Sequence, residues 1–147
     1  MIAYFDSSAL VKLFLAEPDG PVALEIWNEA DHVTTSAVSY VEVRAALARA
    51  ARENPHRLSS TGYEDAKGVF EELWSQIFPI AVSTDLVGDA GNVAEEYELR
   101  AYDALQFATA LSVDDERLLF ATADHDLERA ARTAGVTLTA LSAMPSD

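Results

Sequence analysis

The sequence predicts an α/β domain whose parallel sheet is covered by helices on both faces. Short apolar runs alternate along the chain with longer amphipathic segments, which is the pattern of strands alternating with helices. The chain has 147 residues and half of them are apolar, enough for one domain with a sizeable core. The sequence contains no repeat, low-complexity tract or linker. We therefore expect residues 1–141 to form a single domain and residues 142–147 a C-terminal tail.

The first half of the chain begins with an apolar run, Ile2 to Phe5, that ends abruptly at Asp6, as a buried strand does. Asp6 or Ser7 then caps a helix over 7–15, which Pro18-Asp19-Gly20 ends. The elements expected next are a helix over 22–30, a strand over 32–35, a helix from Ser36 or Ser39 to about Arg52 that stops at Asn54-Pro55, and a polar loop over 56–62.

The second half repeats the alternation of helices and short apolar runs. It is expected to contain a helix over 63–76, an apolar run over 78–82 around Pro79, a helix capped by Ser83 that reaches about Leu99, a helix over 101–112, a turn over 113–116, a strand over 118–121, a helix from Asp124 to Ala134 and a last strand over 136–138. Gly135 ends the last helix, since glycine adopts the left-handed conformation found after many helices.

The absence of cysteine excludes disulfides and thiolate metal sites, and it suits the reducing cytoplasm. The N-terminal segment has no charged region ahead of a long apolar stretch, so it indicates a strand and not a signal peptide. No run approaches the roughly 20 apolar residues that span a bilayer. We therefore expect a cytoplasmic protein with no membrane partner.

The net charge of −15 argues, taken alone, against a nucleic-acid partner, because phosphate binding usually leaves a basic footprint. Two features relax that argument. Carboxylates gathered around cations invert the local field, and several of the ten basic residues cluster in one expected helix and its exit, namely Arg44, Arg49, Arg52 and Arg57. For most of the remaining acids, solubility is the simpler explanation.

Two aspartates follow directly after predicted strands. Asp6 comes after the first strand, and Asp124 comes shortly after the strand over 118–121. In open α/β sheets, ligands collect outside the carboxyl ends of the strands, so the two acids share a site if their strands are neighbours. Taken singly, each is better explained as the N-cap of the helix that follows, and it is the pair at equivalent strand ends that favours a shared site. The sequence leaves both interpretations open.

Two further acids lie within predicted helices. Glu42 sits in SAVSYVEVRAAL on a largely apolar face, without a basic residue three or four positions on. It is either functional, or an edge residue that reaches solvent or a distant arginine. Asp103 forms, with Gln106 and Thr109, the polar stripe of LRAYDALQFATAL. That stripe either lines a polar cleft or faces water.

Carboxylates on separate elements suit one chemistry in particular. Mg²⁺ and Mn²⁺ prefer oxygen ligands, and such ions activate water and stabilise charge on a phosphate during in-line displacement. Asp6, Glu42, Asp103 and Asp124 are the candidate ligands and catalytic acids. Asp126 is either a further ligand or a solvated acid of the first helical turn. The expected reaction is hydrolysis by activated water without a covalent enzyme intermediate.

Four segments of the sequence resemble the motifs of a known family. DSSALVKLFL, YVEVRAAL, LRAYDALQFATAL and LFATADHDLERAA are similar, in order, to the four acidic motifs of PIN domains, and most similar to those of VapC toxins of VapBC toxin–antitoxin pairs. The resemblance extends from about Ile2 to Leu138. It implies a three-layer α/β/α sandwich with a parallel sheet of about five strands. It also implies Mg²⁺-dependent endoribonuclease activity, with Mn²⁺ as a substitute, a VapB-like antitoxin as partner, and a homodimer.

The resemblance also assigns residues. By position, Asp6, Glu42, Asp103 and Asp124 correspond to the metal-binding acids, and Ser7 and Thr122 occupy places where the family often has a polar support. Ser7 is equally explained as a helix cap. Many relatives have a histidine where this chain has Gln106, and that change is expected to affect substrate contacts more than activity.

RNA contacts are expected from basic and aromatic side chains. Lys12, Arg44, Arg49 and Arg52 are the candidates for phosphate, although arginine on an exposed helix is often simply solvated. Tyr40, Tyr102 and Phe107 are candidates for base stacking, although aromatic residues at helical spacing usually belong to the core. The three histidines have no metal-ligand spacing.

The residues after the first strand disfavour two other phosphate chemistries on a similar sheet. A response-regulator receiver needs paired acids after its first strand and a late lysine, and a haloacid-dehalogenase phosphatase needs an aspartate where Ser8 stands. Both are disfavoured. Two alternatives stay open: a PIN-like module that binds RNA or protein without catalysis, and a nuclease of RNA processing outside a toxin–antitoxin pair.

Overall fold

A computed structural model of the chain describes residues 1–141, and the tail expected over 142–147 lies outside the described residues. The sheet has five parallel strands in the order β3-β2-β1-β4-β5. The strands are β1 (Ile2–Phe5), β2 (His32–Ser36), β3 (Phe78–Ile80), β4 (Leu118–Thr122) and β5 (Leu138–Ala140). The helices are α1 (Ser7–Leu10), η1 (Val11–Leu13, a 3₁₀ turn), α2 (Gly20–Glu29), α3 (Ser39–Glu53), α4 (Ser60–Trp74), α5 (Thr84–Tyr97), α6 (Ala101–Leu111) and α7 (His125–Ala134).

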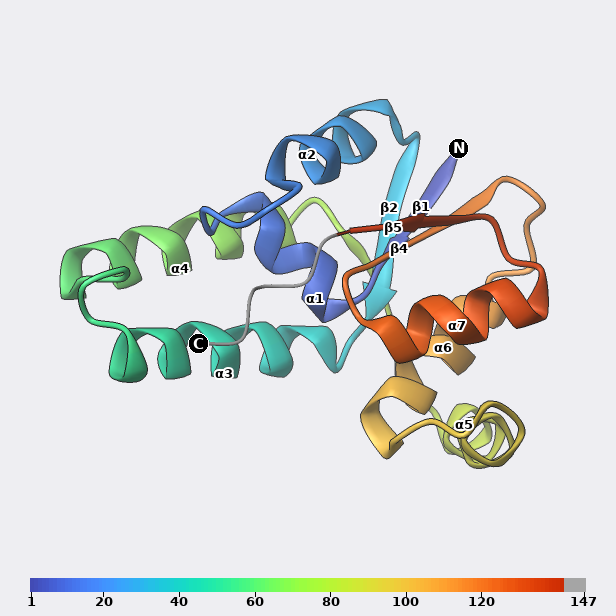
Figure 1. The fold of residues 1–147 in the computed structure, drawn as a ribbon. Coiled ribbons are helices and arrows are strands. Elements are labelled where there is room, and N and C mark those ends of the chain that lie inside the picture. Colours follow the sequence, from blue (N-terminus) through green and yellow to red (C-terminus); the bar gives the residue numbers. More distant parts are fainter. Residues whose placement is uncertain (142–147) are drawn as a thin grey trace.

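Two hydrophobic cores lie on opposite faces of the sheet. Successive side chains of a strand point to opposite faces, and β1 shows this directly: Phe5 belongs to the core with α1 to α4, whereas Tyr4 belongs to the core with α5 to α7. In Figure 1, α3 and α4 extend as a pair to one side of the sheet, and α5, α6 and α7 are grouped on the other. The expected three-layer α/β/α sandwich with a parallel sheet is confirmed.

The order of the strands creates a point where the chain direction across the sheet reverses. From β1 the chain moves outward to β2 and β3, and it then returns to the other side of β1 as β4. Helices diverge from each other at such a point and leave a crevice at the carboxyl ends of the two central strands, which is where open α/β sheets bind ligands. Asp6 and Asp124 flank that crevice.

Several element boundaries differ from the sequence-based expectation. The first helix ends at Leu10 and tightens into the 3₁₀ turn η1, instead of continuing to Leu15. Helix α4 starts at Ser60, earlier than expected, because the Ser59 hydroxyl accepts a hydrogen bond from the backbone N–H of Gly62 and caps the helix. The last strand is shifted to Leu138–Ala140, since it pairs with the end of β4.

The strand β3 forms one edge of the sheet. Pro79 lies in β3 at the edge of the sheet, where a missing N–H is tolerated, and the run expected over 78–82 is a strand only as far as Ile80. Within residues 1–141, no helix combines the length and the apolar character needed to cross a membrane.

Candidate metal centre

The carboxyl ends of β1 and β4 lie side by side and carry the first and the last candidate acid. Phe5 pairs with Ala121 in the parallel register, and the backbone N–H of Asp6 donates to the carbonyl of Ala121 at 3.2 Å. Asp124 follows β4 and begins helix α7 as its N-cap. The condition set by the sequence, that the two strands be neighbours, is therefore met.

Asp6 is buried, with 2% of its surface exposed. Its carboxylate accepts three hydrogen bonds: from Ser8 Oγ at 2.6 Å, from the Ala9 backbone N–H at 2.9 Å, and from Thr122 Oγ1 at 2.6 Å. Burial raises the pKa of Asp6 to about 7 and the neighbouring charge of Asp124 raises it as well, whereas the three hydrogen bonds oppose that rise. Asp6 is thus both the N-cap of α1 and part of a charged site.

The serines beside Asp6 divide their roles in a way the sequence did not reveal. Ser8, and not Ser7, donates to Asp6, and its hydroxyl also accepts from the Ala123 backbone N–H at 2.9 Å. Ser8 therefore bridges the ends of β1 and β4. Ser7 instead hydrogen-bonds to Glu42 and lowers the pKa of that carboxyl. Ser8 was missed because a serine two residues after an aspartate has no distinctive sequence signal.

Glu42 lies in the first turn of α3 and is half-buried. Its Oε1 accepts a hydrogen bond of 2.7 Å from Nε2 of Gln106, a residue of α6. Burial raises the pKa of Glu42, and the hydrogen bonds from Gln106 and Ser7 oppose that rise. Its described partners are therefore neutral polar groups in the crevice, and not the distant arginine that the sequence left open.

Three aspartates bring a carboxylate oxygen within 4.8 Å of one another: Asp103 at the start of α6, and Asp124 and Asp126 at the start of α7. Burial, together with the charges of Asp124, Glu42 and Asp126, raises the pKa of Asp103 to about 6. Asp124 also caps α7, since its Oδ1 accepts from the Leu127 backbone N–H at 3.0 Å.

Asp126, which the sequence left between a ligand and a solvated acid, belongs to this group by position. It is exposed, and its Oδ1 also accepts from Arg129 at 3.0 Å. The polar stripe that begins with Asp103 does not face water, because Gln106 and Thr109 are 2% and 0% exposed. This stripe runs from the crevice into the interior.

The donor set fits a divalent cation. Every candidate ligand is a carboxylate, and hard oxygen donors of this kind are what Mg²⁺ and Mn²⁺ prefer. The charges of Asp124, Glu42 and Asp126 all act on Asp103, so they oppose ionisation of that carboxyl, and a bound cation would relieve this repulsion. His125 exposes 82% of its side chain and lies 3.7 Å from Glu128, outside this acidic group.

The basic residues proposed for RNA contacts occupy different environments. Lys12 is 3% exposed and lies 3.4 Å from the carboxylate of Glu17, so its ammonium is not on the surface and we do not retain it as a phosphate contact. Arg44 pairs with Glu71 at 3.0 Å, and Arg49 pairs with Glu53 at 3.1 Å. Arg52 is exposed and forms no ion pair within residues 1–141.

The aromatic candidates for base stacking also differ in their exposure to solvent. Phe107 is fully buried in the core, and Tyr40 is half-buried with its hydroxyl bonded to Glu71 and Arg44. Tyr102 is 62% exposed and immediately precedes Asp103. It lines a shallow groove between α3 and α6 together with Val38, Val41, Glu42, Ala45, Ala46 and Arg49. This groove begins at the acidic site.

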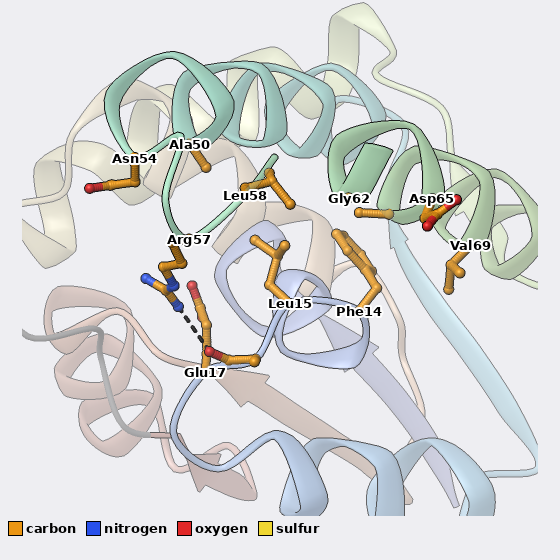
Figure 2. A pocket seen from close by; sticks show the side chains of 12 residues that line it. Phe14, Leu15, Glu17, Ala50, Asn54, Arg57, Leu58, Gly62, Asp65 and Val69 are labelled. Atoms are coloured by element: carbon orange, nitrogen blue, oxygen red, sulfur yellow. Dashed lines mark hydrogen bonds between the residues drawn. The ribbon is translucent and has the colours of Figure 1, made fainter. Parts of the chain in front are cut away.

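A second hollow lies away from the acids, under the α3–α4 pair. It is lined mainly by apolar side chains, among them Phe14, Leu15 and Leu58, as Figure 2 shows. Arg57 closes one end by donating to the backbone carbonyl of Ala16 at 2.9 Å. None of the candidate metal ligands lines this hollow, so it plays no part in the site.

Comparisons with known proteins agree with this architecture. A family model described as "PIN domain" matches residues 3–133. Ribonuclease VapC45 of Mycobacterium tuberculosis is 37% identical over 134 residues, covering 91% of this chain and 92% of that protein.

Two solved structures show the same fold. PAE2754 from Pyrobaculum aerophilum has a TM-score of 0.66 at 22% identity, covering 94% of this chain and 83% of that chain. VapBC2 from Rickettsia felis, bound to a DNA fragment from their promoter, has a TM-score of 0.66 at 16% identity, covering 97% and 100%. The family model and the 37% identical ribonuclease both match most of the sequence. The chain therefore belongs to the PIN domain family and is a homologue of the VapC ribonucleases.

Proposed function

We infer that this chain is a VapC-type ribonuclease, the toxin of a VapBC toxin–antitoxin pair, and that it hydrolyses RNA phosphodiester bonds with the help of Mg²⁺ or Mn²⁺. One observation carries the inference: Asp103, Asp124 and Asp126 converge within 4.8 Å beside Asp6 and Glu42, at the carboxyl end of a PIN-domain sheet. The 37% identity with a ribonuclease supports RNA as the substrate.

The acids divide into two roles in this proposal. Asp103, Asp124 and Glu42 are the proposed ligands, with Asp126 beside the two aspartates. Asp6 completes the negative field from the end of β1. A divalent ion bound there supplies activation of water and neutralisation of charge on the phosphate. Asp6, with three hydrogen bonds from the protein, fixes the geometry of the crevice while adding charge.

RNA would approach across the α3–α6 side of the crevice. Tyr102 exposes its ring next to Asp103, where a base flanking the scissile phosphate could stack on it. Arg52 on α3 is the proposed contact to the backbone, whereas Arg44 and Arg49 would first have to leave Glu71 and Glu53. With a net charge of −15, these few basic groups and the bound cations must provide most of the attraction for phosphate.

A VapB-like antitoxin is the proposed protein partner. One structural neighbour is named as the pair VapBC2, and another as a toxin–antitoxin complex from Klebsiella pneumoniae. An acidic crevice of this kind is blocked most directly by a partner that inserts a basic side chain. We further propose a homodimer, and action in the cytoplasm, where RNA is available and a chain without cysteine needs no oxidising environment.

The test is cleavage of a mixed RNA substrate by the purified chain in Mg²⁺, in Mn²⁺ and in EDTA. Cleavage should require the metal and should disappear in Asp6→Asn, with circular dichroism showing an unchanged fold. Full activity of Asp6→Asn would contradict the assignment of that acid. Absence of metal-dependent cleavage, together with absence of a metal-linked rise in Tm, would favour a non-catalytic binding module.

A further inference from the structure

A buried chain of hydrogen bonds leads from Glu42 to the sheet. Gln106 is 2% exposed, and its Nε2 donates to Glu42 Oε1 at 2.7 Å and to Ser39 Oγ at 2.8 Å. Its Oε1 accepts from the hydroxyl of Tyr4 at 2.7 Å. Ser39 Oγ lies 2.7 Å from Thr35 Oγ1, which in turn donates to the backbone carbonyl of Phe5 at 2.6 Å.

The donors and acceptors available fix the direction of every hydrogen bond in this series. A hydroxyl has one hydrogen, and that of Thr35 is committed to the carbonyl of Phe5, so Ser39 must donate to Thr35. Ser39 can then only accept from Gln106, and the carboxylate of Glu42 also accepts. Both hydrogens of the Gln106 amide are therefore used, and its oxygen must face Tyr4.

This arrangement prevents the amide from flipping. Rotation by 180° would place Oε1 of Gln106 against the carboxylate of Glu42, which sets two acceptors against each other, and it would leave the Tyr4 hydroxyl without its acceptor. Tyr4 and Ser39 are both fully buried, so water cannot easily replace either partner. One oxygen of Glu42 is thus held by a group that cannot turn away from it.

We propose that Gln106 is a positioning residue that holds Glu42 in the orientation needed to bind the divalent cation, acting through the buried Tyr4–Gln106–Ser39–Thr35 network. The network ends on the carbonyl of Phe5, the residue before Asp6. It therefore ties an acid on α3 to the strand end that carries another acid. This inference rests on the proposed function, since it assigns Glu42 to the metal site.

The proposal explains why a buried glutamine stands at this place. Groups that orient a metal ligand are worth about 10–100-fold in metal affinity or activity. A neutral amide can donate to Glu42 and Ser39 together while accepting from Tyr4, which a hydrocarbon of the same size cannot do. The direct consequence is that Gln106 affects metal binding without contacting the metal.

The experiment measures the Mn²⁺ dissociation constant by electron paramagnetic resonance, and kcat and KM with a short RNA, for Gln106→Leu, Tyr4→Phe and Gln106→His. Gln106→Leu should weaken Mn²⁺ binding about tenfold and lower kcat with little change in KM. Tyr4→Phe, which removes the donor to Oε1 of Gln106 but keeps the bonds of its Nε2 to Glu42 and Ser39, should show a smaller change in the same direction. Gln106→His restores one donor and should recover part of the affinity.

Thr34→Val is the matched control, because Thr34 is a buried threonine of β2 whose hydroxyl donates to the carbonyl of Phe78 in the edge strand β3. It should leave the Mn²⁺ dissociation constant unchanged. If Gln106→Leu fails to fold, Tyr4→Phe decides the question. Folded variants that bind Mn²⁺ and cleave as well as wild type would overturn this inference alone, whereas a wild type that binds no Mn²⁺ would overturn the proposed function and this inference with it.

Discussion

Thr122 donates a hydrogen bond of 2.6 Å from Oγ1 to Oδ2 of Asp6, joining the ends of β4 and β1 across 116 residues of sequence. Because this bond favours the ionised carboxylate, it lowers the pKa of a group whose burial raises it to about 7. The two central strands are thus joined at the crevice by a contact that also adjusts the charge of the site.

Thr122→Val is expected to raise the pKa of Asp6 further. A hydrogen bond to a charged group is worth about 1.5–3 kcal/mol, so the acidic limb of the pH–rate profile should move up by about one to two pH units. Cleavage at pH 7 should fall and should recover at higher pH. A profile displaced no more than that of Thr34→Val would contradict this role for Thr122.

Substitutions at Asp124 should separate its two roles. Asparagine caps helices as well as aspartate does, so Asp124→Asn should retain the stability of α7, whereas Asp124→Ala should cost about 1 kcal/mol. Both should reduce cleavage by more than about 100-fold, since loss of a ligand exceeds the effect of outer-shell changes. Chemical denaturation and cleavage rates are the measurements.

The control for Asp124 is another helix cap. Ser83 caps α5 by accepting from the Leu86 backbone N–H at 3.1 Å, and it is remote from the acids in sequence and element. Ser83→Ala should lose a comparable amount of stability and keep full cleavage. An Asp124→Asn variant that cleaves normally would show that this acid serves only as a cap.

The metal-free protein should lose stability as pH rises from about 4 to 7. The pKa values of Asp6 and Asp103 are raised to about 7 and about 6, so in that window the folded state binds more protons than the unfolded state. The free energy of unfolding therefore falls with rising pH. Asp103→Asn should reduce this slope and add about 1 kcal/mol at pH 8, a figure discounted for partial exposure.

Denaturation in EDTA at a series of pH values checks this expectation. Asp115→Asn is the control, because Arg117 lowers the pKa of Asp115 to about 2 and this group does not titrate in the same window. Its slope should match that of wild type. A stability that rises between pH 4 and 7, or a slope unaffected by Asp103→Asn, would refute the raised pKa values of Asp6 and Asp103, which burial and the neighbouring charges produce.

Tyr102→Ala is expected to raise KM for RNA about tenfold, because stacking of one base on an aromatic ring is worth about 1–3 kcal/mol. Its kcat and stability should change little, since the ring is exposed and forms no described hydrogen bond. Steady-state kinetics with a short RNA measures the split. Leu24→Ala, another exposed apolar side chain, should leave KM unchanged.

The sequence predicted those parts of the site that depend on local pattern. Asp6 and Asp124 were placed at strand ends because an apolar run stops there, and the sheet makes those strands neighbours. The three-layer fold followed from alternating strands and helices, and the resemblance to PIN domains is confirmed. The predicted helix boundary was wrong where a single capping residue sets it, as Ser59 does for α4.

The sequence could not predict contacts between distant segments. Glu42 accepts a hydrogen bond from Gln106, which lies 64 residues later. Gln106 belongs to the polar stripe that the sequence left between lining a cleft and facing water, and its side chain is buried. Lys12 looked available for phosphate, but the chain turns so that it is buried beside Glu17. Asp126 joins the acidic group because α7 begins at the crevice, although its position in the first helical turn is explained equally well by solvation.

Cleavage of RNA in Mg²⁺ and in EDTA, by wild type and by Asp124→Asn, is the most direct test of the claim that the acidic crevice is a metal-dependent nuclease site. The account predicts cleavage by wild type in Mg²⁺ only, and none by Asp124→Asn under either condition. Cleavage that persists in EDTA, or that Asp124→Asn retains in Mg²⁺, would contradict it.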